Sequence, residues 1–176
     1  MKQIGLNFIV RPSGIKETLI SGESPAKNVR RIALAKARDV AKRFPKGIVV
    51  GADTIVVLRN RILGKPRGRE GAKRMLRSLS GKSHDVFTGF AIVDAGSGAF
   101  VSRAVRTRVW FRRLSNEEIS GYVASGSPLD KAGAYGIQDD FGAVFVERIS
   151  GCFYNVVGFP LARFHRALQE FTTNLE

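Results

Sequence analysis

The sequence predicts an α/β fold: a single domain over residues 1–176, with a mixed, twisted β-sheet flanked by helices. Two observations predict this class. Segments rich in β-branched residues alternate with segments whose apolar residues recur every three or four positions, the spacing of a helix face. The length of 176 residues suits one domain with a sizeable core. We find no internal repeat, low-complexity tract or linker that would divide it.

The first half of the chain is expected to contain three strands and two helices. Ser24 followed by Pro25 is a typical helix start, with serine as the cap and proline in the first turn. Gly81 is a typical helix end. The expected elements are a short strand over 6–10, a helix from 24 to about 43, a buried strand over 48–58, a short strand over 62–64 and a helix over 69–79.

The second half is expected to open with a β-hairpin. Its strands cover 87–93 and 100–111, and the glycine-containing segment 94–98 joins them. Ser115 and Glu118 have the spacing of a capping box, which predicts a short helix to about Ala124. A further strand is expected over 144–149, and Pro160 is expected to start a C-terminal helix.

The charge of the chain is unusual. Lys and Arg total 29 against 15 Asp and Glu, which gives a net charge of +14. Such a balance indicates an anionic partner or a basic host proteome. The basic residues are scattered along the chain, and no helix-turn-helix, zinc-finger or aromatic ribonucleoprotein motif accompanies them. Charge alone therefore supports phosphate binding, and it does not choose between a nucleotide and a nucleic acid.

Composition also narrows the class of protein. No apolar stretch has the roughly 18 residues needed to span a membrane, and the N-terminus lacks the pattern of a signal peptide, so a cytoplasmic protein without a membrane partner is expected. A single cysteine, Cys152, excludes an intramolecular disulfide and a multi-cysteine metal site. Cys152 is either a packed or semi-exposed thiol or a nucleophile, and we favour the packed or semi-exposed thiol.

Asp53 is the strongest candidate for chemistry. It lies in the most apolar run of the chain, residues 48–58, which predicts a strand buried on both faces. An ionised carboxylate left unpaired there costs several kcal/mol, so Asp53 needs a cation, a metal or hydrogen-bond donors. The alternative is an aspartate that caps a turn at the end of a strand.

Three other positions are candidates for binding. Lys36 shares the apolar face of the first helix, so its ammonium group either reaches out to water or meets an anion. Lys65 lies between a glycine that permits close approach and a rigid proline. Gln138 ends a glycine-rich segment, 131–138, and its amide suits the edge of a base, although the segment could equally be an ordinary loop.

Five motifs occur in the order found in the Maf family of nucleoside triphosphate pyrophosphatases. They are GADT at 51–54, LGKP at 63–66, SGKSHDVFTG at 80–89, DKAGAYGIQ at 130–138 and NVVGFPL at 155–161. The chain resembles this family over almost its whole length. The motif KAGAYGIQ is similar to the motif of the dTTP/UTP-cleaving subfamily and differs from the motif of the branch that acts on 7-methyl-GTP.

The resemblance implies a Maf/inosine-triphosphatase-like fold, often a homodimer, that hydrolyses dTTP and UTP to the monophosphate and pyrophosphate with a divalent cation, Mg²⁺ or Mn²⁺. It implies that Asp53 accepts a proton or binds the metal, that Thr54 and Gln138 influence base choice, and that Lys36 and Lys65 line the phosphate site. Glu17 matches an acidic metal-site residue, although the family usually has Asp-Glu where this chain has Lys16-Glu17.

The chain departs from the family pattern at its N-terminus. Family members carry an A-S-x-S-P-R-R loop about twenty residues before the equivalent of Gln3, and this loop supplies an arginine for the triphosphate. We expect Met1 to be an internal methionine of the helix that follows that loop. Either this methionine was assigned as the start in error, or the chain is truncated. A truncated chain is expected to have weaker activity and lower stability.

Two competing functions remain open at this point. The same fold could act on another or a modified nucleotide. Alternatively, the chain could be a basic nucleic-acid-binding or division-associated protein whose catalysis is weakened.

Overall fold

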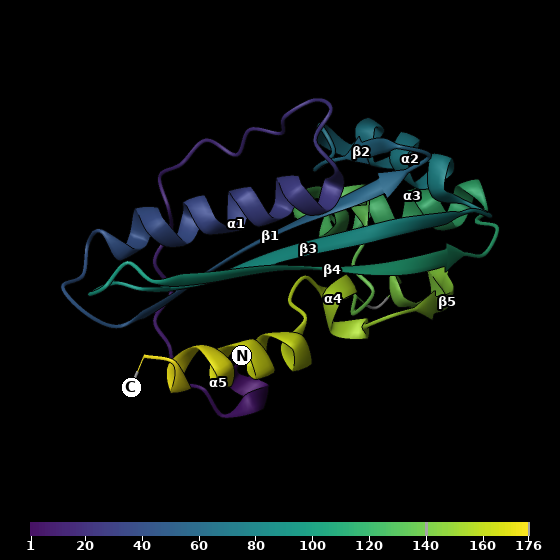
Figure 1. The fold of residues 1–176 in the computed structure, drawn as a ribbon. Helices are drawn as coiled ribbons and strands as arrows, with labels where there is room; N and C mark the ends of the chain where they lie inside the picture. Colours follow the sequence, from purple (N-terminus) through teal and green to yellow (C-terminus); the bar gives the residue numbers. More distant parts are fainter. Residues whose placement is uncertain (140, 176) are drawn as a thin grey trace. The chain divides into compact units, whose positions relative to one another are not determined.

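The computed structural model describes residues 1–139 and 141–175. In this part of the chain, five α-helices flank one five-stranded sheet, whose strand order is β2-β1-β3-β4-β5 (Figure 1). The strands are β1 Ile48–Leu58, β2 Arg61–Leu63, β3 Ser83–Asp94, β4 Phe100–Phe111 and β5 Val146–Ser150. The helices are α1 Pro25–Ala41, α2 Gly68–Leu79, α3 Asn116–Ala124, α4 Phe153–Val157 and α5 Leu161–Thr173. The predicted α/β class is confirmed.

Strand β1 pairs with β2, and β4 pairs with β5, in antiparallel fashion, whereas the sequence predicted a mixed sheet. In the first, Val57 of β1 is opposite Ile62 of β2, and Arg59 and Asn60 form the tight turn between them with positive φ angles. In the second, Val109 of β4 is opposite Ile149 of β5. The first pairing fixes the start of the segment that carries Lys65.

The chain forms two compact units, each built from separate segments. The first unit comprises Met1–Asp53, Thr88–Val105 and Phe159–Glu176, and the second comprises Thr54–Phe87 and Arg106–Gly158. Strands β1, β3 and β4 each contribute residues to both units. The expectation of a single domain over the whole chain stays a prediction.

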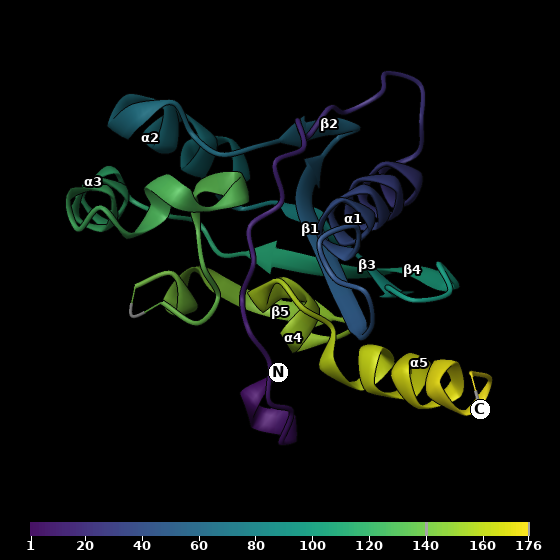
Figure 2. The same cartoon turned by 90° about the vertical axis from the view of Figure 1, so that its left-hand side faces the viewer.

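In the first unit, helices cover both faces of the strands. Successive residues of β3 point to opposite faces, and they divide between two apolar clusters. Ala91 and Val93 pack with alanines of α1, whereas Phe90 and Ile92 pack with Phe164 and Ala167 of α5. Figure 2 shows α1 and α5 on opposite sides of these strands. The alternation along β3 therefore explains the layering of this unit.

In the second unit, α2 and α3 contribute to one large core. Leu76 and Leu79 of α2 and Ile119 and Tyr122 of α3 belong to the same buried cluster as strand residues from β1, β3 and β4. The capping box at the start of α3 is confirmed, because the Ser115 hydroxyl accepts from the Glu118 amide while the Glu118 carboxylate accepts from the Ser115 amide. The local capping signal and the packing of the core thus both favour the helix α3.

Several element predictions are corrected by the structure. Residues 6–10 are mostly exposed and have no regular secondary structure, so the strand expected there is not formed. The expected burial of β1 on both faces is correct for Ile55–Leu58 and wrong for 48–50 and 52–54, which are exposed or half-buried. Helix α4 was not predicted, since its five residues are too few to show a helical period. Strand β3 begins four residues earlier than expected.

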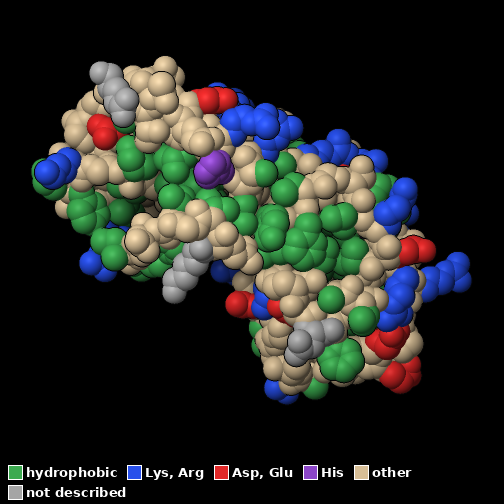
Figure 3. All heavy atoms as spheres, turned by 90° about the horizontal axis from the view of Figure 1, so that it is seen from below, with side chains coloured by type: hydrophobic (Ala, Val, Ile, Leu, Met, Phe, Trp, Pro, Cys, Tyr) green, Lys and Arg blue, Asp and Glu red, His purple; other side chains and the backbone are tan. Residues whose placement is uncertain are grey.

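The surface agrees with the expectation drawn from the distribution of charge. Lys and Arg side chains lie at several separate places on the face drawn in Figure 3, as their scatter along the sequence predicts. Within residues 1–139 and 141–175, none of the helices combines the length and the apolar character that crossing a membrane requires.

Candidate active site

A lysine joins two carboxylates at the centre of the candidate site. The Nζ atom of Lys36, on α1, lies 2.8 Å from Oδ1 of Asp53 on β1 and 2.7 Å from Oε1 of Glu17. The Asp53 side chain is 9% exposed and that of Glu17 is 56% exposed, so the cluster runs from the protein interior to the surface. The sequence left open whether Lys36 reaches water or an anion, and in the structure it binds two anions.

The charge of Lys36 is stabilised by these partners. Partial burial lowers the pKa of the Lys36 ammonium, but hydrogen bonds and charge attraction from Asp53 and then Glu17 outweigh burial and raise the pKa above its ordinary value. Lys36 is therefore a cation at neutral pH. It can hold anions in place, and it is unsuited to accept a proton.

Close packing of α1 on the strands explains how Lys36 reaches Asp53. A Cβ atom at Gly51 would overlap the carbonyl oxygen of Ala33 and lie 2.8 Å from the amide nitrogen of Ala37. A Cβ atom at Gly89 would likewise overlap the Val29 carbonyl group. The two glycines let α1 approach β1 and β3 closely, and Asp53 lies two residues after Gly51 on the same face of its strand.

Glu17 is positioned by a segment without regular secondary structure, residues 6–23, which α1 holds through side chains (Figure 1). The Asn28 amide group, which is fully buried, exchanges hydrogen bonds with both backbone groups of Ile20. Arg31 donates to the Thr18 carbonyl group, and Asp39 accepts from the Gly14 amide. These contacts bring Glu17 to Lys36, and sequence reasoning missed them because polar residues on a helix usually face water.

The remaining predicted site residues belong to the second unit. The Thr54 hydroxyl donates to the carbonyl oxygen of Gly158, within the NVVGFPL motif, at 3.3 Å. Lys65 is exposed between β2 and α2, and Gln138 is exposed in a turn. The structure brings Lys36, Asp53 and Glu17 together in the first unit, and the placement of Thr54, Lys65 and Gln138 relative to them stays a prediction.

The turn that carries Gln138 is fixed by a polar network centred on Asp139. Its carboxylate accepts hydrogen bonds from the Tyr122 hydroxyl at 2.9 Å and the Ser127 hydroxyl at 2.7 Å, and it pairs with Lys131 at 3.3 Å. The Tyr122 oxygen also accepts from the Gly136 amide. Burial, together with the adjacent carboxylate, raises the pKa of Tyr122 to about 12, so its hydroxyl stays a donor. These contacts hold Lys131 and Gly136 of the glycine-rich segment, which also contains a short 3-10 helix over Ala132–Ala134.

Carboxylates are the residues here that suit a divalent cation. Asp53 and Glu17 each place an oxygen within 2.8 Å of the same nitrogen, and hard cations prefer such oxygen ligands. Within residues 1–139 and 141–175, no group of three or more His, Cys, Asp or Glu side chains is arranged to hold a metal ion. A cation held by these two carboxylates would need further ligands from substrate or water.

These features define an α/β protein with a charged acid–lysine site of the kind that phosphate chemistry uses. The chain belongs to the Maf-like protein family, whose model matches residues 1–171.

Several curated relatives are similar over nearly the whole chain. A dTTP/UTP pyrophosphatase of Pelotomaculum thermopropionicum is 45% identical over 99% of this chain and 91% of its own length. A dTTP/UTP pyrophosphatase of Moorella thermoacetica is 47% identical over 97% of this chain and 88% of its own length. A dTTP/UTP pyrophosphatase of Methanosarcina barkeri is 46% identical over 95% of this chain and 84% of its own length. The resemblance inferred from the five motifs is confirmed.

Proposed function

We propose that this protein hydrolyses the nucleoside triphosphates dTTP and UTP to the nucleoside monophosphate and pyrophosphate. The observation that carries the proposal is the Lys36 bridge between Asp53 and Glu17. It occurs in a chain 45% identical to a relative named dTTP/UTP pyrophosphatase.

The chemistry assigns a role to each residue of the bridge. Hydrolysis adds one water across the anhydride bond between the α and β phosphates, and the attacking water must lose a proton. Because Lys36 remains protonated, Asp53 is the proton acceptor, and the Lys36 charge attracts the phosphoryl oxygens. Glu17, at the exposed end of the bridge, keeps Lys36 in position for the substrate.

Three residues of the second unit are proposed to recognise the rest of the substrate. Lys65 supplies a point charge for the triphosphate. The Gln138 amide both donates and accepts, which matches the O4 acceptor and N3–H donor shared by thymine and uracil. Thr54, whose hydroxyl is oriented by the Gly158 carbonyl group, is proposed to assist this base choice.

A divalent cation, Mg²⁺ or Mn²⁺, is proposed to be held by Asp53 and Glu17 together with the triphosphate. When bound, such a cation neutralises charge that develops on the phosphoryl oxygens. Chelation by EDTA is then expected to abolish turnover, and added Mg²⁺ or Mn²⁺ is expected to restore it. Turnover that persists in EDTA would contradict this part of the proposal.

The substrate class is tested by incubating the protein and Mg²⁺ with dTTP, UTP, CTP and 7-methyl-GTP in parallel. Chromatography should show monophosphate and pyrophosphate in equal amounts, with faster turnover of dTTP and UTP. Release of diphosphate and phosphate would contradict the bond assignment, and preferred turnover of 7-methyl-GTP would support the alternative of the same fold acting on a modified nucleotide. Light scattering on a sizing column tests the homodimer that the family resemblance implies.

A further inference from the structure

Half of the net charge of this chain comes from one short segment of the second unit. Residues 59–77 contain eight Lys or Arg and one acidic residue, Glu70, whereas the whole chain has a net charge of +14. The segment runs from the β1–β2 turn through β2 to α2. We call its eight cations the basic surface: Arg59, Arg61, Lys65, Arg67, Arg69, Lys73, Arg74 and Arg77.

Most of these cations have no anionic partner within the described residues. Lys73 pairs with Glu70 at 2.9 Å, and Arg77 donates to the amide oxygen of Asn116. Across residues 1–139 and 141–175, the other six make no ion pair. Six exposed cations on one segment repel each other, and an anionic ligand relieves that repulsion.

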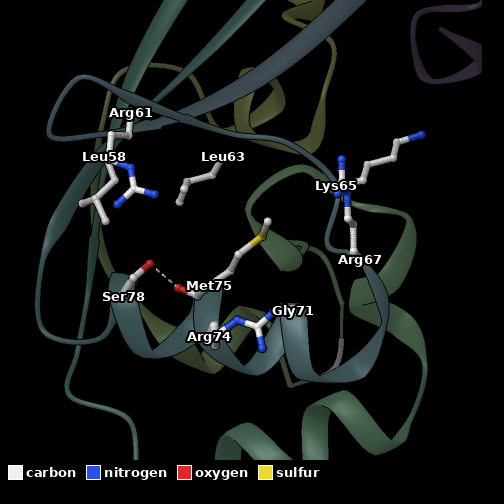
Figure 4. A pocket seen from close by; sticks show the side chains of 9 residues that line it. All are labelled: Leu58, Arg61, Leu63, Lys65, Arg67, Gly71, Arg74, Met75 and Ser78. Atoms are coloured by element: carbon white, nitrogen blue, oxygen red, sulfur yellow. Dashed lines mark hydrogen bonds between the residues drawn. The ribbon is translucent and has the colours of Figure 1, made fainter.

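A cavity lies within the basic surface. It has a volume of about 490 Å³, and Leu58, Leu63 and Met75 form its apolar part. In Figure 4, Leu63 from β2 and Met75 from α2 extend towards each other. Arg61 and Arg74 lie beside them, and Arg67 lies towards the other end. A cavity with an apolar floor and arginines at its rim suits a nucleotide. Its planar base would lie on the apolar floor, and its phosphate would contact the guanidinium groups.

The basic surface extends beyond the cavity. Arg69, Lys73 and Arg77 recur every four residues, so they form a row along α2, which is about 18 Å long. A single nucleotide in the cavity would not contact this row of cations. A polyanion with one charge per nucleotide can contact both the cavity and the row.

From these observations we infer that the basic surface binds single-stranded nucleic acid, with a base in the cavity and the phosphate backbone along α2. The basic surface shares Lys65 with the proposed triphosphate site. Neither Arg61 nor Arg74 is assigned to the proposed hydrolysis, so the test changes these two residues. A single strand is favoured over a duplex because only unpaired bases can enter the cavity.

The test measures binding of a fluorescein-labelled thymidine oligonucleotide of about 20 nucleotides by anisotropy, in EDTA so that no nucleotide is hydrolysed. The variant Arg61→Gln/Arg74→Gln is expected to bind about tenfold more weakly at about 50 mM salt. Its slope of log affinity against log salt is expected to fall by about 1.4, because each lost contact with a single strand contributes about 0.7.

Two variants serve as controls. Arg163→Gln/Arg166→Gln removes the same charge from exposed positions of α5 and is expected to bind within about twofold of the wild type. Arg61→Lys/Arg74→Lys keeps the charge and is expected to retain the salt slope. Thermal unfolding of each variant shows that it is folded.

Three outcomes would overturn the inference. Equal weakening by the two glutamine variants would show that only net charge matters. Duplex of the same length binding as tightly as the single strand would remove the role of the cavity. Inorganic pyrophosphate can be added so that its phosphate groups equal those of the oligonucleotide in concentration. Displacement of the oligonucleotide under this condition would indicate a site for small anions instead.

Discussion

Lys36 joins two carboxylates from distant parts of the sequence, and its energetic role is intermediate between a surface and a buried ion pair. The Lys36 side chain is 20% exposed, and Asp53 is less exposed still. Exposed pairs contribute about 0–1 kcal/mol, whereas removing one partner of a buried pair costs about 3–5 kcal/mol. Removing one partner of the bridge is therefore expected to destabilise the fold, because the other partner keeps an uncompensated charge.

Replacing Lys36 tests this role. Lys36→Met is expected to lower the free energy of unfolding by about 2 kcal/mol, because Asp53 then keeps a half-buried charge without its cation. The matched change Lys73→Met, in an exposed pair with Glu70, is expected to cost less than about 1 kcal/mol. Urea unfolding measures both.

A double-mutant cycle completes this test. Combining Lys36→Met with Asp53→Asn is expected to cost less than the sum of the single changes by about 1 kcal/mol or more. Additive costs would contradict an interaction between the two side chains.

His84 supplies a second prediction at the scale of one residue. Its ring is buried beside Phe111 and Tyr135, and its Nε2 atom lies 2.7 Å from the Tyr135 hydroxyl oxygen. Burial lowers the pKa of His84 from 6.5 to about 4, although the nearby Asp85 charge opposes this shift. The unfolded chain therefore binds a proton between these pH values that the folded chain does not.

The direction in which the free energy of unfolding changes with pH follows from that difference in proton binding. The stability associated with neutral His84 is fully present above pH 6.5 and is lost as the pH falls towards 4, by up to about 3 kcal/mol. In His84→Gln, the fall in unfolding free energy between these pH values is expected to be smaller. An NMR titration in which the His84 ring protonates near 6.5 would contradict this prediction.

At the scale of elements, the contact between α1 and its strands decides where the site forms. The sequence predicted the start of α1, because Ser24 and Pro25 are local signals, and it predicted that Lys36 shares the buried face. It could not predict which strand faces Lys36, since the packing that pairs Gly51 with Ala33 joins distant residues. The same limit applies to the segment that carries Glu17.

Gly51→Ala tests this contact. The added methyl group meets the α1 backbone, so α1 must shift, and a loss of about 1–3 kcal/mol in unfolding free energy is expected together with reduced turnover. Gly121→Ala is the control, because nothing lies within 4 Å of a Cβ atom there and the position is helical. That control is expected to gain about 0.5–1 kcal/mol. Equal effects of the two substitutions on turnover would contradict close packing as the cause.

At the scale of the whole molecule, the predicted site residues divide between the two units. Lys36, Asp53 and Glu17 belong to the first unit, and Thr54, Lys65 and Gln138 belong to the second. Asp53 is the last residue of its segment in the first unit, and Thr54 begins the second. Motif order along the chain was enough to identify the family, because five ordered motifs rarely coincide by chance. The contacts that orient each side chain required the structure.

The most direct measurement is the turnover of dTTP by Asp53→Asn compared with Asp85→Asn. Both changes remove a strand carboxylate that pairs with basic side chains. Because Asp53 is the proposed proton acceptor, Asp53→Asn is expected to lower kcat about 100-fold or more. Asp85→Asn is expected to stay within about threefold of the wild type, since Asp85 pairs with the exposed Arg106 and Arg108 and is no part of the Lys36 bridge. Wild-type turnover in Asp53→Asn would contradict the assignment of the site.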